Sequence, residues 1–417
     1  MKKINLIDCT LRDGGYYNNW HFSEKLIQSY FNTMKNLNIL NLEVGFITLE
    51  DGVGITGNID KNFYRKFKIS NKINCGVMIN TKEILNNSKE ICKYKSNRLF
   101  KKIPKKTNFI RFACHHNEIL PLLKFLKIKK FKQKIFINIM QISGIPKNQL
   151  LKISKISNEL KINYIYIADS FGCLSQSKTR EIIKNIKSQY NLNVGIHAHD
   201  NLGFALKNSI TAIKNGANWI DSTVMGMGRG AGNLKTEDII KFLNFSLEKR
   251  KQLNLFIKRY FQELKNKYKW GKNRYYKFAA KNLIHPTYIQ EILSNKIYGK
   301  SEYNKILSFL KKLNTKKFNP YNLLNLKYFI NNNIGQIKGL NKVDLQKNIL
   351  VVGPSKLINH HKKYCRNLIK DKNNISILAL NKSNFISDKF IDYRLTCHPQ
   401  RLYSDISFHL KNKNKLI

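Results

Sequence analysis

The sequence predicts a (β/α)8 barrel that carries a helical extension and a small α/β tail. Over about the first 245 residues, short β-branched apolar runs alternate with amphipathic segments. Strands covered on both faces read as continuous apolar runs, and eight strand–helix repeats of this total length match a (β/α)8 barrel. A doubly wound open sheet is the alternative, but no G-x-G-x-x-G follows the first run.

Eight runs are the predicted barrel strands. They cover residues 4–9, 41–46, 73–79, 108–113, 134–140, 162–169, 193–199 and 218–224. The segments between them are predicted helices. In the first, an apolar stripe at helical spacing runs from Leu26 through Tyr30 and Met34 to Leu37, after a candidate N-cap at Ser23.

The chain of 417 residues has room for this barrel and two appendages. We expect the barrel over 1–245 and a helical extension, rich in Lys, Tyr and Leu, over 246–335. A small α/β unit is expected over 345–417, in which a β-branched run from Asn348 is followed by a helix over 358–370. Because this unit is short, it predicts an incomplete Rossmann-like fold, and a truncated, inactive homologue is one interpretation of the chain.

Composition argues for a cytoplasmic globular protein. Hydrophobic residues make up 42%, and no apolar run approaches the ~18 residues of a membrane span. The N-terminal segment lacks the apolar core and cleavage site of a signal peptide. Seven cysteines, an odd number without a C-x-x-C, argue against a disulfide framework or a zinc–thiolate site.

The formal net charge of +49 raises the question of a nucleic-acid partner. Lys far outnumbers Arg and is spread along the whole chain, whereas a dedicated nucleic-acid surface is typically clustered and rich in Arg. We therefore expect no specific nucleic-acid partner. The alternative is a barrel that has lost its chemistry and keeps a binding role.

Two distant stretches predict one metal site. Asp13 follows the first strand, while His197 and His199, at i and i+2, share one face at the end of the seventh. Barrel closure places the eighth strand beside the first and seventh, and active sites lie at the C-terminal ends of the strands. We expect these three residues to bind a divalent metal, with Asn233 of the following glycine-rich loop as a further ligand.

This mixed ligand set favours Mn²⁺, with Mg²⁺, Co²⁺ and Zn²⁺ as alternatives. A 2-oxo acid can chelate such an ion through its carboxylate and carbonyl oxygens, and the adjacent Arg12 would stabilise the enolate. Taken singly, an H-x-H pair or an R-D-G turn is usually structural, whereas Glu43 at an inward strand end and Asp169–Ser170 at a helix start are as often functional as structural. Their joint position at one end of a barrel indicates an active site.

These residues together resemble a known family, the DRE-TIM metallolyase superfamily, which includes HMG-CoA lyase. The resemblance covers roughly residues 4–240 and is closest to the 4-hydroxy-2-oxovalerate aldolase-like branch. Its motifs are Asp8-x-Thr10-Leu11-Arg12-Asp13-Gly14, Glu43, Asp169-Ser170-x-Gly172, His197-x-His199-Asp200-Asn201-x-Gly203 and Gly230-x-Gly232-Asn233.

The resemblance implies a role for each matched residue. It implies metal binding by Asp13, His197, His199 and Asn233, catalysis by Arg12 and Glu43, and substrate binding by Arg12, Ser170, His197 and Tyr275. One position departs from the aldolases, where a histidine three residues after the metal-binding aspartate is the general base. Here Tyr16 stands in that position, and a phenol is less suited than imidazole to proton transfer at neutral pH. His21 is the alternative.

We therefore predict a divalent-metal-dependent aldolase that cleaves a 4-hydroxy-2-oxo acid to pyruvate and an aldehyde, or forms it, and that assembles as a homo-oligomer. A Claisen-type enzyme that condenses an acyl-CoA is the alternative within the superfamily. The aldolases pair with an acylating aldehyde dehydrogenase through their helical C-terminal region. This chain's extension and tail differ from that region, so we do not expect an aldehyde dehydrogenase partner.

Overall fold

The computed structural model describes residues 4–49, 53–85, 88–128, 131–162, 164–295, 298–323, 326, 343–346, 348–353, 367–369, 374–381, 386–396 and 408. The chain forms two compact units, Met1–Lys296 and Ile297–Ile417. The boundary lies inside the segment predicted as the helical extension, 246–335. The first helices of that segment therefore belong to the same unit as the barrel.

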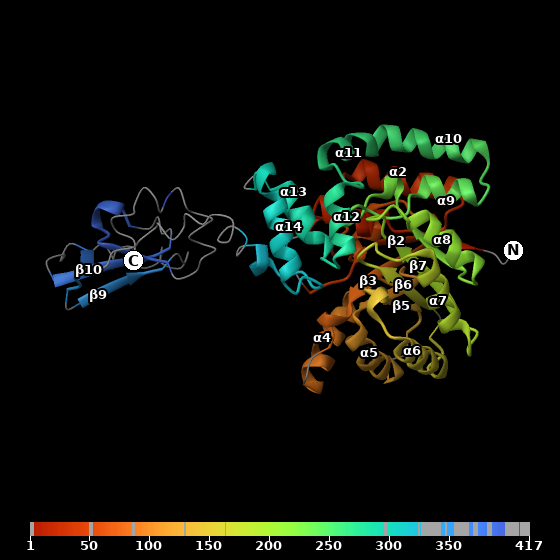
Figure 1. Cartoon of the computed structure of the whole chain (residues 1–417), viewed down its shortest axis with the longest axis horizontal. Helices are drawn as coiled ribbons and strands as arrows, with labels where there is room; N and C mark the ends of the chain where they lie inside the picture. Colours follow the sequence, from red (N-terminus) through yellow and green to blue (C-terminus); the bar gives the residue numbers. More distant parts are fainter. Residues whose placement is uncertain are drawn as a thin grey trace. The chain divides into compact units, whose positions relative to one another are not determined.

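Eight parallel strands close into a barrel in sequence order, which confirms the predicted fold (Figure 1). The strands are β1 (Asn5–Asp8), β2 (Asn41–Phe46), β3 (Asn74–Asn80), β4 (Phe109–Cys114), β5 (Lys134–Ile139), β6 (Tyr164–Asp169), β7 (Asn193–Ala198) and β8 (Trp219–Ser222).

Closure of the barrel is set by the pairing of β8 with both β1 and β7. Ile7 of β1 pairs with Asp221 of β8, and Ile196 of β7 pairs with Ile220. The segments that follow β1, β7 and β8 therefore lie at adjacent positions of the barrel rim, although about 200 residues separate the first from the others. This register is what brings the two predicted half-sites together.

Helices cover the outside of the barrel, as the amphipathic segments predict (Figure 1). The predicted N-cap is confirmed, since Ser23 Oγ accepts a hydrogen bond from the Leu26 amide at the start of α2. The helices of this region are α1 (Thr10–Asp13), α2 (Glu24–Leu37), α3 (Lys61–Lys66), α4 (Lys89–Lys102), α5 (His116–Ile128), α6 (Lys147–Glu159), α7 (Gln176–Lys187), α8 (Ala205–Lys214) and α9 (Thr236–Phe242).

Aromatic side chains fill the barrel interior near the N-terminal ends of the strands. Phe136 stacks on Tyr164 with ring centroids 4.1 Å apart, and Trp219 meets Phe136 edge-on at 5.3 Å. Tyr166, one inward position further along β6, is completely buried above them. The barrel is therefore a packed core at this end, and room for a ligand remains only toward the C-terminal ends.

The extension adds four helices to the barrel unit: α10 (Leu247–Phe256), α11 (Gln262–Tyr268), α12 (Arg274–Lys281) and α13 (Pro286–Ser294). Phe256 of α10 packs beside Tyr30 of α2. Tyr276 of α12 and Gln290 of α13 make hydrogen bonds to the segment after β1. In the described part of the chain, no helix has the length and hydropathy needed to span a bilayer.

The second unit contains α14 (Tyr303–Lys312) and a three-stranded parallel sheet of order β11-β10-β9. Its strands are β9 (Asn348–Val352), β10 (Ile375–Leu380) and β11 (Tyr393–Leu395). Val352, Ile377 and Ile391 are in its small buried core. The parallel sheet agrees with the predicted α/β tail, whereas the helix expected over 358–370 lies, apart from 367–369, outside the described residues.

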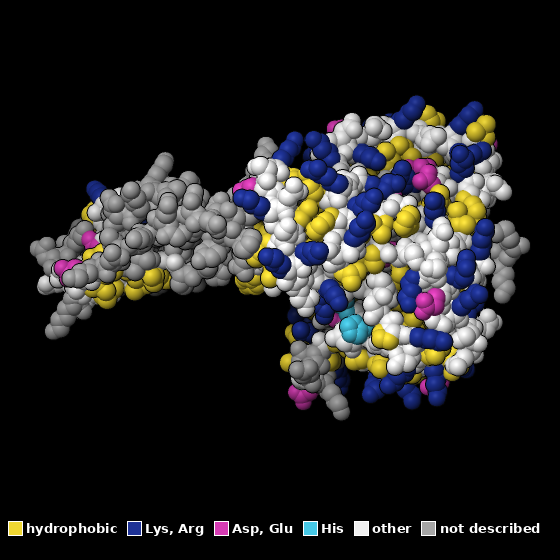
Figure 2. All heavy atoms as spheres, viewed as in Figure 1, with side chains coloured by type: hydrophobic (Ala, Val, Ile, Leu, Met, Phe, Trp, Pro, Cys, Tyr) yellow, Lys and Arg dark blue, Asp and Glu magenta, His cyan; other side chains and the backbone are white. Residues whose placement is uncertain are grey.

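Lys and Arg side chains are dispersed over the face of the barrel unit that Figure 2 shows. Hydrophobic and uncharged groups lie between them on this face. This distribution agrees with the dispersal of Lys along the sequence.

Candidate active site

Three predicted metal ligands converge at the C-terminal end of the barrel. Asp13 ends α1, directly after β1, while His197 lies in β7 and His199 just beyond it. One ligand atom from each residue lies within 4.8 Å of the others, and all three side chains are buried. A carboxylate and two imidazoles at this spacing can hold one divalent cation.

Asn233 completes this group from the loop after β8. Its backbone forms an isolated antiparallel bridge with His199, and its Nδ2 donates a hydrogen bond to Asp13 Oδ2. Asn233 Oδ1 and His199 Nδ1 are buried and have no hydrogen-bond partner among the described residues. Buried polar atoms are normally satisfied, so these two atoms fit a site completed by a bound cation.

The electrostatics leave two of the ligands deprotonated. Burial would raise the pKa of Asp13, but the adjacent Arg12 and His197 hold it well below its usual range. Burial and the neighbouring His197 lower the pKa of His199 to about 3, so its imidazole is neutral at physiological pH. Because metal ligands must be deprotonated, both groups are ready to coordinate.

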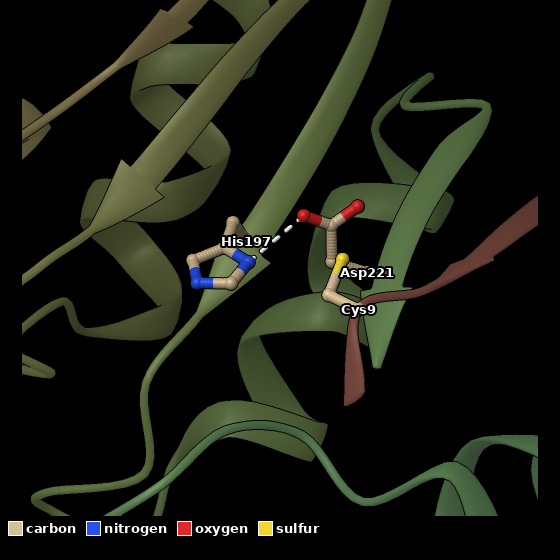
Figure 3. Close-up of side chains that lie close together, drawn as sticks. All are labelled: Cys9, His197 and Asp221. Carbon is tan, nitrogen blue, oxygen red and sulfur yellow. Dashed lines mark hydrogen bonds and ion pairs between the residues drawn. The ribbon is translucent and has the colours of Figure 1, made fainter. Parts of the chain in front are cut away.

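His197 is held by an acidic residue that the sequence prediction missed. Its Nδ1 donates to Asp221 Oδ2 at 2.8 Å (Figure 3), and its Nε2 lies 3.6 Å from Asp13 Oδ2. Burial alone would lower the pKa of His197, but hydrogen bonds to Asp13 and Asp221 raise it. Asp221 thereby fixes the tautomer in which Nδ1 carries the proton and Nε2 faces Asp13.

Figure 3 also places Cys9 beside this pair, at the end of the first strand. Cys9, His197 and Asp221 have their ligand-type atoms within 4.8 Å of one another. However, burial, together with the charges of Asp221 and Glu43, raises the pKa of the Cys9 thiol well above its usual range. A protonated thiol is a poor metal ligand, and the member of this second grouping that contacts His197 is Asp221.

A buried charge network lies beneath the metal group. Arg111 of β4 is fully buried and donates to Asp221 at 2.7 Å, to Glu43 at 3.4 Å and to Asn138 at 3.3 Å. Its guanidinium lies over the ring of Tyr166, 4.3 Å from the centroid. The network holds the carboxylates of β2 and β8 in fixed positions.

Arg12 connects this network to the pocket. Its Nε donates to Glu43 at 2.8 Å, and Nη1 pairs with Asp13. Nη2 is buried without a hydrogen-bond partner in the described part of the chain. Arg12 lines the pocket, so Nη2 is a donor available to a substrate oxygen, whereas Glu43 is not among the lining residues and acts through Arg12.

The pocket brings together most of the predicted residues. Ser170 is buried in its wall and accepts a hydrogen bond from the Gln141 amide at 3.0 Å. Tyr16 is half-buried and packs edge-on against Trp20 and Phe46. The lining residues are Arg12, Asp13, Tyr16, Met78, Asn80, Ala113, Asn138, Met140, Ala168, Ser170, His197, His199 and Arg229.

Four predicted site residues are not among the lining residues: Glu43 and Asn233, which are hydrogen-bonded to Arg12 and Asp13, and His21 and Tyr275. His21 is exposed and is not among the lining residues. Tyr275 accepts a hydrogen bond from Arg274 at 2.8 Å and does not line the pocket either. The neighbouring Tyr276 is the buried tyrosine of α12, and its hydroxyl lies 3.2 Å from that of Tyr17.

The motif around Asp8 has a structural role. Asp8 is completely buried and accepts hydrogen bonds from the hydroxyls of Thr10, Tyr30 and Thr236. Thr10 in turn accepts a hydrogen bond from the Val224 amide at 2.8 Å. These contacts tie the end of β1 to α2, α9 and the segment after β8, and so hold the Arg12–Asp13 turn in register with the histidines.

Comparison with known proteins identifies the family of this chain. A family model described as HMGL-like matches residues 3–256. The chain belongs to the HMGL-like family. This confirms the resemblance to the DRE-TIM metallolyases, and the matched region contains the whole barrel and every metal-ligand candidate.

Curated relatives of this chain include the 4-hydroxy-2-oxovalerate aldolase of Carboxydothermus hydrogenoformans. It is 33% identical over 135 residues, which is 32% of this chain and 40% of that protein. The protein of the same name from Bacillus thuringiensis is 36% identical over 96 residues, 23% of this chain and 28% of that protein. The chain thus matches less than half the length of these relatives.

Solved structures match over a longer span. The N-terminal domain of a "putative aldolase" from Bacteroides vulgatus is 30% identical, with a TM-score of 0.61, and the match covers 70% of this chain and 98% of that one. The carboxyl transferase domain of Rhizobium etli pyruvate carboxylase, solved with pyruvate, has a TM-score of 0.58 at 13% identity. This match covers 79% of this chain and 60% of that one. The latter similarity concerns the fold alone.

Proposed function

We propose that this HMGL-like chain is a divalent-metal-dependent aldolase that joins pyruvate, or a similar 2-oxo acid, to an aldehyde, and cleaves the resulting 4-hydroxy-2-oxo acid. The observation that carries the proposal is the convergence of Asp13, His197 and His199 within 4.8 Å, beside a buried arginine. The names of the related curated proteins support the aldolase class.

The residues that would hold the metal are Asp13, His197 and His199, with Asn233 able to add an amide oxygen. A bound divalent cation supplies Lewis-acid polarisation of a carbonyl oxygen. We favour Mn²⁺ because the ligand set mixes carboxylate, imidazole and amide groups, and Mg²⁺, Co²⁺ and Zn²⁺ remain alternatives.

Arg12 acts on the charge that develops when a methyl proton leaves the 2-oxo acid. Its unpartnered Nη2 can donate to the enolate oxygen, while Nε and Nη1 are held by Glu43 and Asp13. A donor fixed before the reaction stabilises the transition state without the cost of reorganisation. Ser170 lines the same pocket and would bind the substrate carboxylate.

Tyr16 is the proton carrier that the pocket supports best. It lines the pocket, whereas His21 is exposed and outside it. In the cleavage direction Tyr16 would take the proton of the 4-hydroxyl, and in the condensation direction it would return one to the aldehyde oxygen. Tyr16, and not His21, is therefore the residue proposed for this step.

The experiment is a coupled assay of pyruvate release from racemic 4-hydroxy-2-oxopentanoate, with Mn²⁺ or EDTA. We expect cleavage only with the metal, and its loss in His199→Ala. Tyr16→Phe should reduce the cleavage rate roughly 100-fold or more, since positioned acid–base groups contribute about that much. If cleavage is absent but pyruvate condenses with acetyl-CoA, the enzyme is a Claisen-type synthase and the aldolase proposal is wrong.

A further inference from the structure

Arg229 is a second arginine in the pocket that neither the metal group nor the enolate site uses. It lies in the loop between β8 and α9 and lines the pocket together with Arg12, Ser170 and His199. The central carbon of its guanidinium lies 5.3 Å from the centroid of the Tyr16 ring. The pocket therefore presents two guanidinium groups to its contents.

The charge of Arg229 is not compensated, unlike that of the other arginines nearby. Arg12 is paired with Asp13 and Glu43, and Arg111 with Asp221 and Glu43. Across the residues that the structure describes, Arg229 has no carboxylate partner, and its Nε is buried without an acceptor. An unsatisfied buried donor is costly, so a ligand that brings an acceptor to it gains free energy.

The loop that carries Arg229 is held in place from both sides. Tyr17 donates its hydroxyl hydrogen to the Gly230 carbonyl at 2.5 Å. Gln290 of α13 accepts from the Gly230 amide at 3.3 Å and donates to the Tyr16 carbonyl at 2.7 Å. Gly230 adopts a φ of +71°, and a side chain there would meet Pro286. Arg229 thus projects from a constrained backbone that is fixed relative to Tyr16.

The position of Arg229 indicates which part of the substrate it meets. Arg12 lies over Phe46, 5.9 Å from its ring centroid, whereas Arg229 lies over Tyr16. The Tyr16 and Phe46 rings meet edge to face at 6.3 Å, so the two cations face different rings of one aromatic wall. In the proposed reaction Arg12 serves the enolate and Tyr16 serves the aldehyde oxygen. Arg229 therefore belongs to the aldehyde side of the pocket.

We propose that Arg229 binds an anionic group, a carboxylate or a phosphate, on the aldehyde, so that the enzyme prefers anionic aldehydes to neutral ones. This inference rests on the proposed aldolase function. In the condensation, pyruvate loses a methyl proton, its C3 bonds to the aldehyde carbon, and the aldehyde oxygen takes up a proton. The anionic group passes unchanged into a 4-hydroxy-2-oxo acid that carries a second anion.

The test compares kcat/KM for condensation of pyruvate with three aldehydes: succinic semialdehyde, glyceraldehyde 3-phosphate and neutral propionaldehyde. The first two distinguish a carboxylate from a phosphate. Wild-type enzyme should prefer at least one of them over propionaldehyde roughly 10- to 100-fold, the range for charge-assisted hydrogen bonds. Arg229→Met should remove that preference, mainly through KM. Arg229→Lys, which keeps the charge but not the planar fork, should restore part of it.

Arg180→Met is the matched control, because Arg180 is an exposed arginine of α7 outside the pocket. It should keep the preference, which separates Arg229 from the general attraction of a chain with a net charge of +49 for anions. Equal losses for anionic and neutral aldehydes in Arg229→Met, or no preference in the wild type, would overturn the inference while condensation itself persists. Absence of condensation with every aldehyde, and of pyruvate methyl-proton exchange, would overturn the proposed function as well.

Discussion

Replacing Asp221 by Asn tests whether the buried network beneath the metal group positions its ligands. Asp221 Oδ2 accepts from His197 Nδ1 at 2.8 Å and from Arg111 at 2.7 Å, and both partners are buried. Asparagine has nearly the same shape but carries no charge and presents only one oxygen. The substitution therefore weakens the hold on the His197 ring and removes one of the two carboxylates that pair with Arg111.

Two magnitudes follow from this geometry. Loss of a residue that orients a metal ligand typically costs 10- to 100-fold in metal affinity, which corresponds to about 1.4–2.8 kcal/mol. Arg111 keeps Glu43 at 3.4 Å, so the loss of one partner should lower the free energy of unfolding by about 3 kcal/mol, the lower end for a broken buried pair.

Isothermal titration with Mn²⁺ measures the first effect, and urea unfolding measures the second. Glu83→Gln is the matched control, because Glu83 is a partly buried carboxylate that accepts from the Thr48 hydroxyl and the Leu49 amide and does not line the pocket. It should lower stability while changing Mn²⁺ affinity less than about threefold. An affinity of Asp221→Asn within twofold of wild type, with the fold intact, would show that Asp221 does not position His197 for metal binding.

Three further predictions concern protons and packing. Since the pKa of His197 is raised, Mn²⁺ binding at mildly acidic pH should displace a proton from its Nε2. The measured binding enthalpy should then vary with the ionisation enthalpy of the buffer. A binding enthalpy that is the same in all buffers would contradict this prediction. The pKa of His199 falls from 6.5 to about 3 on folding, so the metal-free protein should lose stability as the pH decreases from 6.5 toward 3. In urea unfolding, His199→Asn should reduce this dependence of the unfolding free energy on pH. An unchanged dependence would contradict the prediction. Gly228→Ala would place a methyl group 2.6 Å from Asp13 Oδ2 and 2.5 Å from Asn233 Nδ2, so the Mn²⁺ affinity measured by titration should fall at least tenfold. Gly144→Ala adds a methyl group in open space and should keep the Mn²⁺ affinity of the wild type.

The barrel was predictable because its strands are continuous apolar runs and its register follows from closure. All eight predicted strands are confirmed within a few residues at each end. The convergence of Asp13 with His197 and His199 was predictable for the same reason, since i and i+2 on a strand share a face. Asn233 was predictable from its loop and lies beside them.

The supporting residues were harder to predict. Asp221 and Arg111 each interrupt an apolar strand, and a charged residue in such a strand indicates a special role. Their pairing across the barrel, however, depends on which side chains point inward at the same height along the barrel axis. Arg229 and Tyr275 depend on loop and extension geometry, which periodicity does not encode. Glu43 was expected at an inward strand end, yet its role as the partner of both Arg12 and Arg111 emerges only from three-dimensional distances.

The central claim is that Asp13, His197 and His199 hold a divalent cation that makes the methyl protons of a 2-oxo acid labile. Deuterium uptake into pyruvate in D₂O, followed by mass spectrometry with Mn²⁺ and with EDTA, tests it most directly. We expect uptake that requires the metal and disappears in His197→Ala. Uptake that continues in EDTA or in that variant, or none with Mn²⁺ bound, would contradict it.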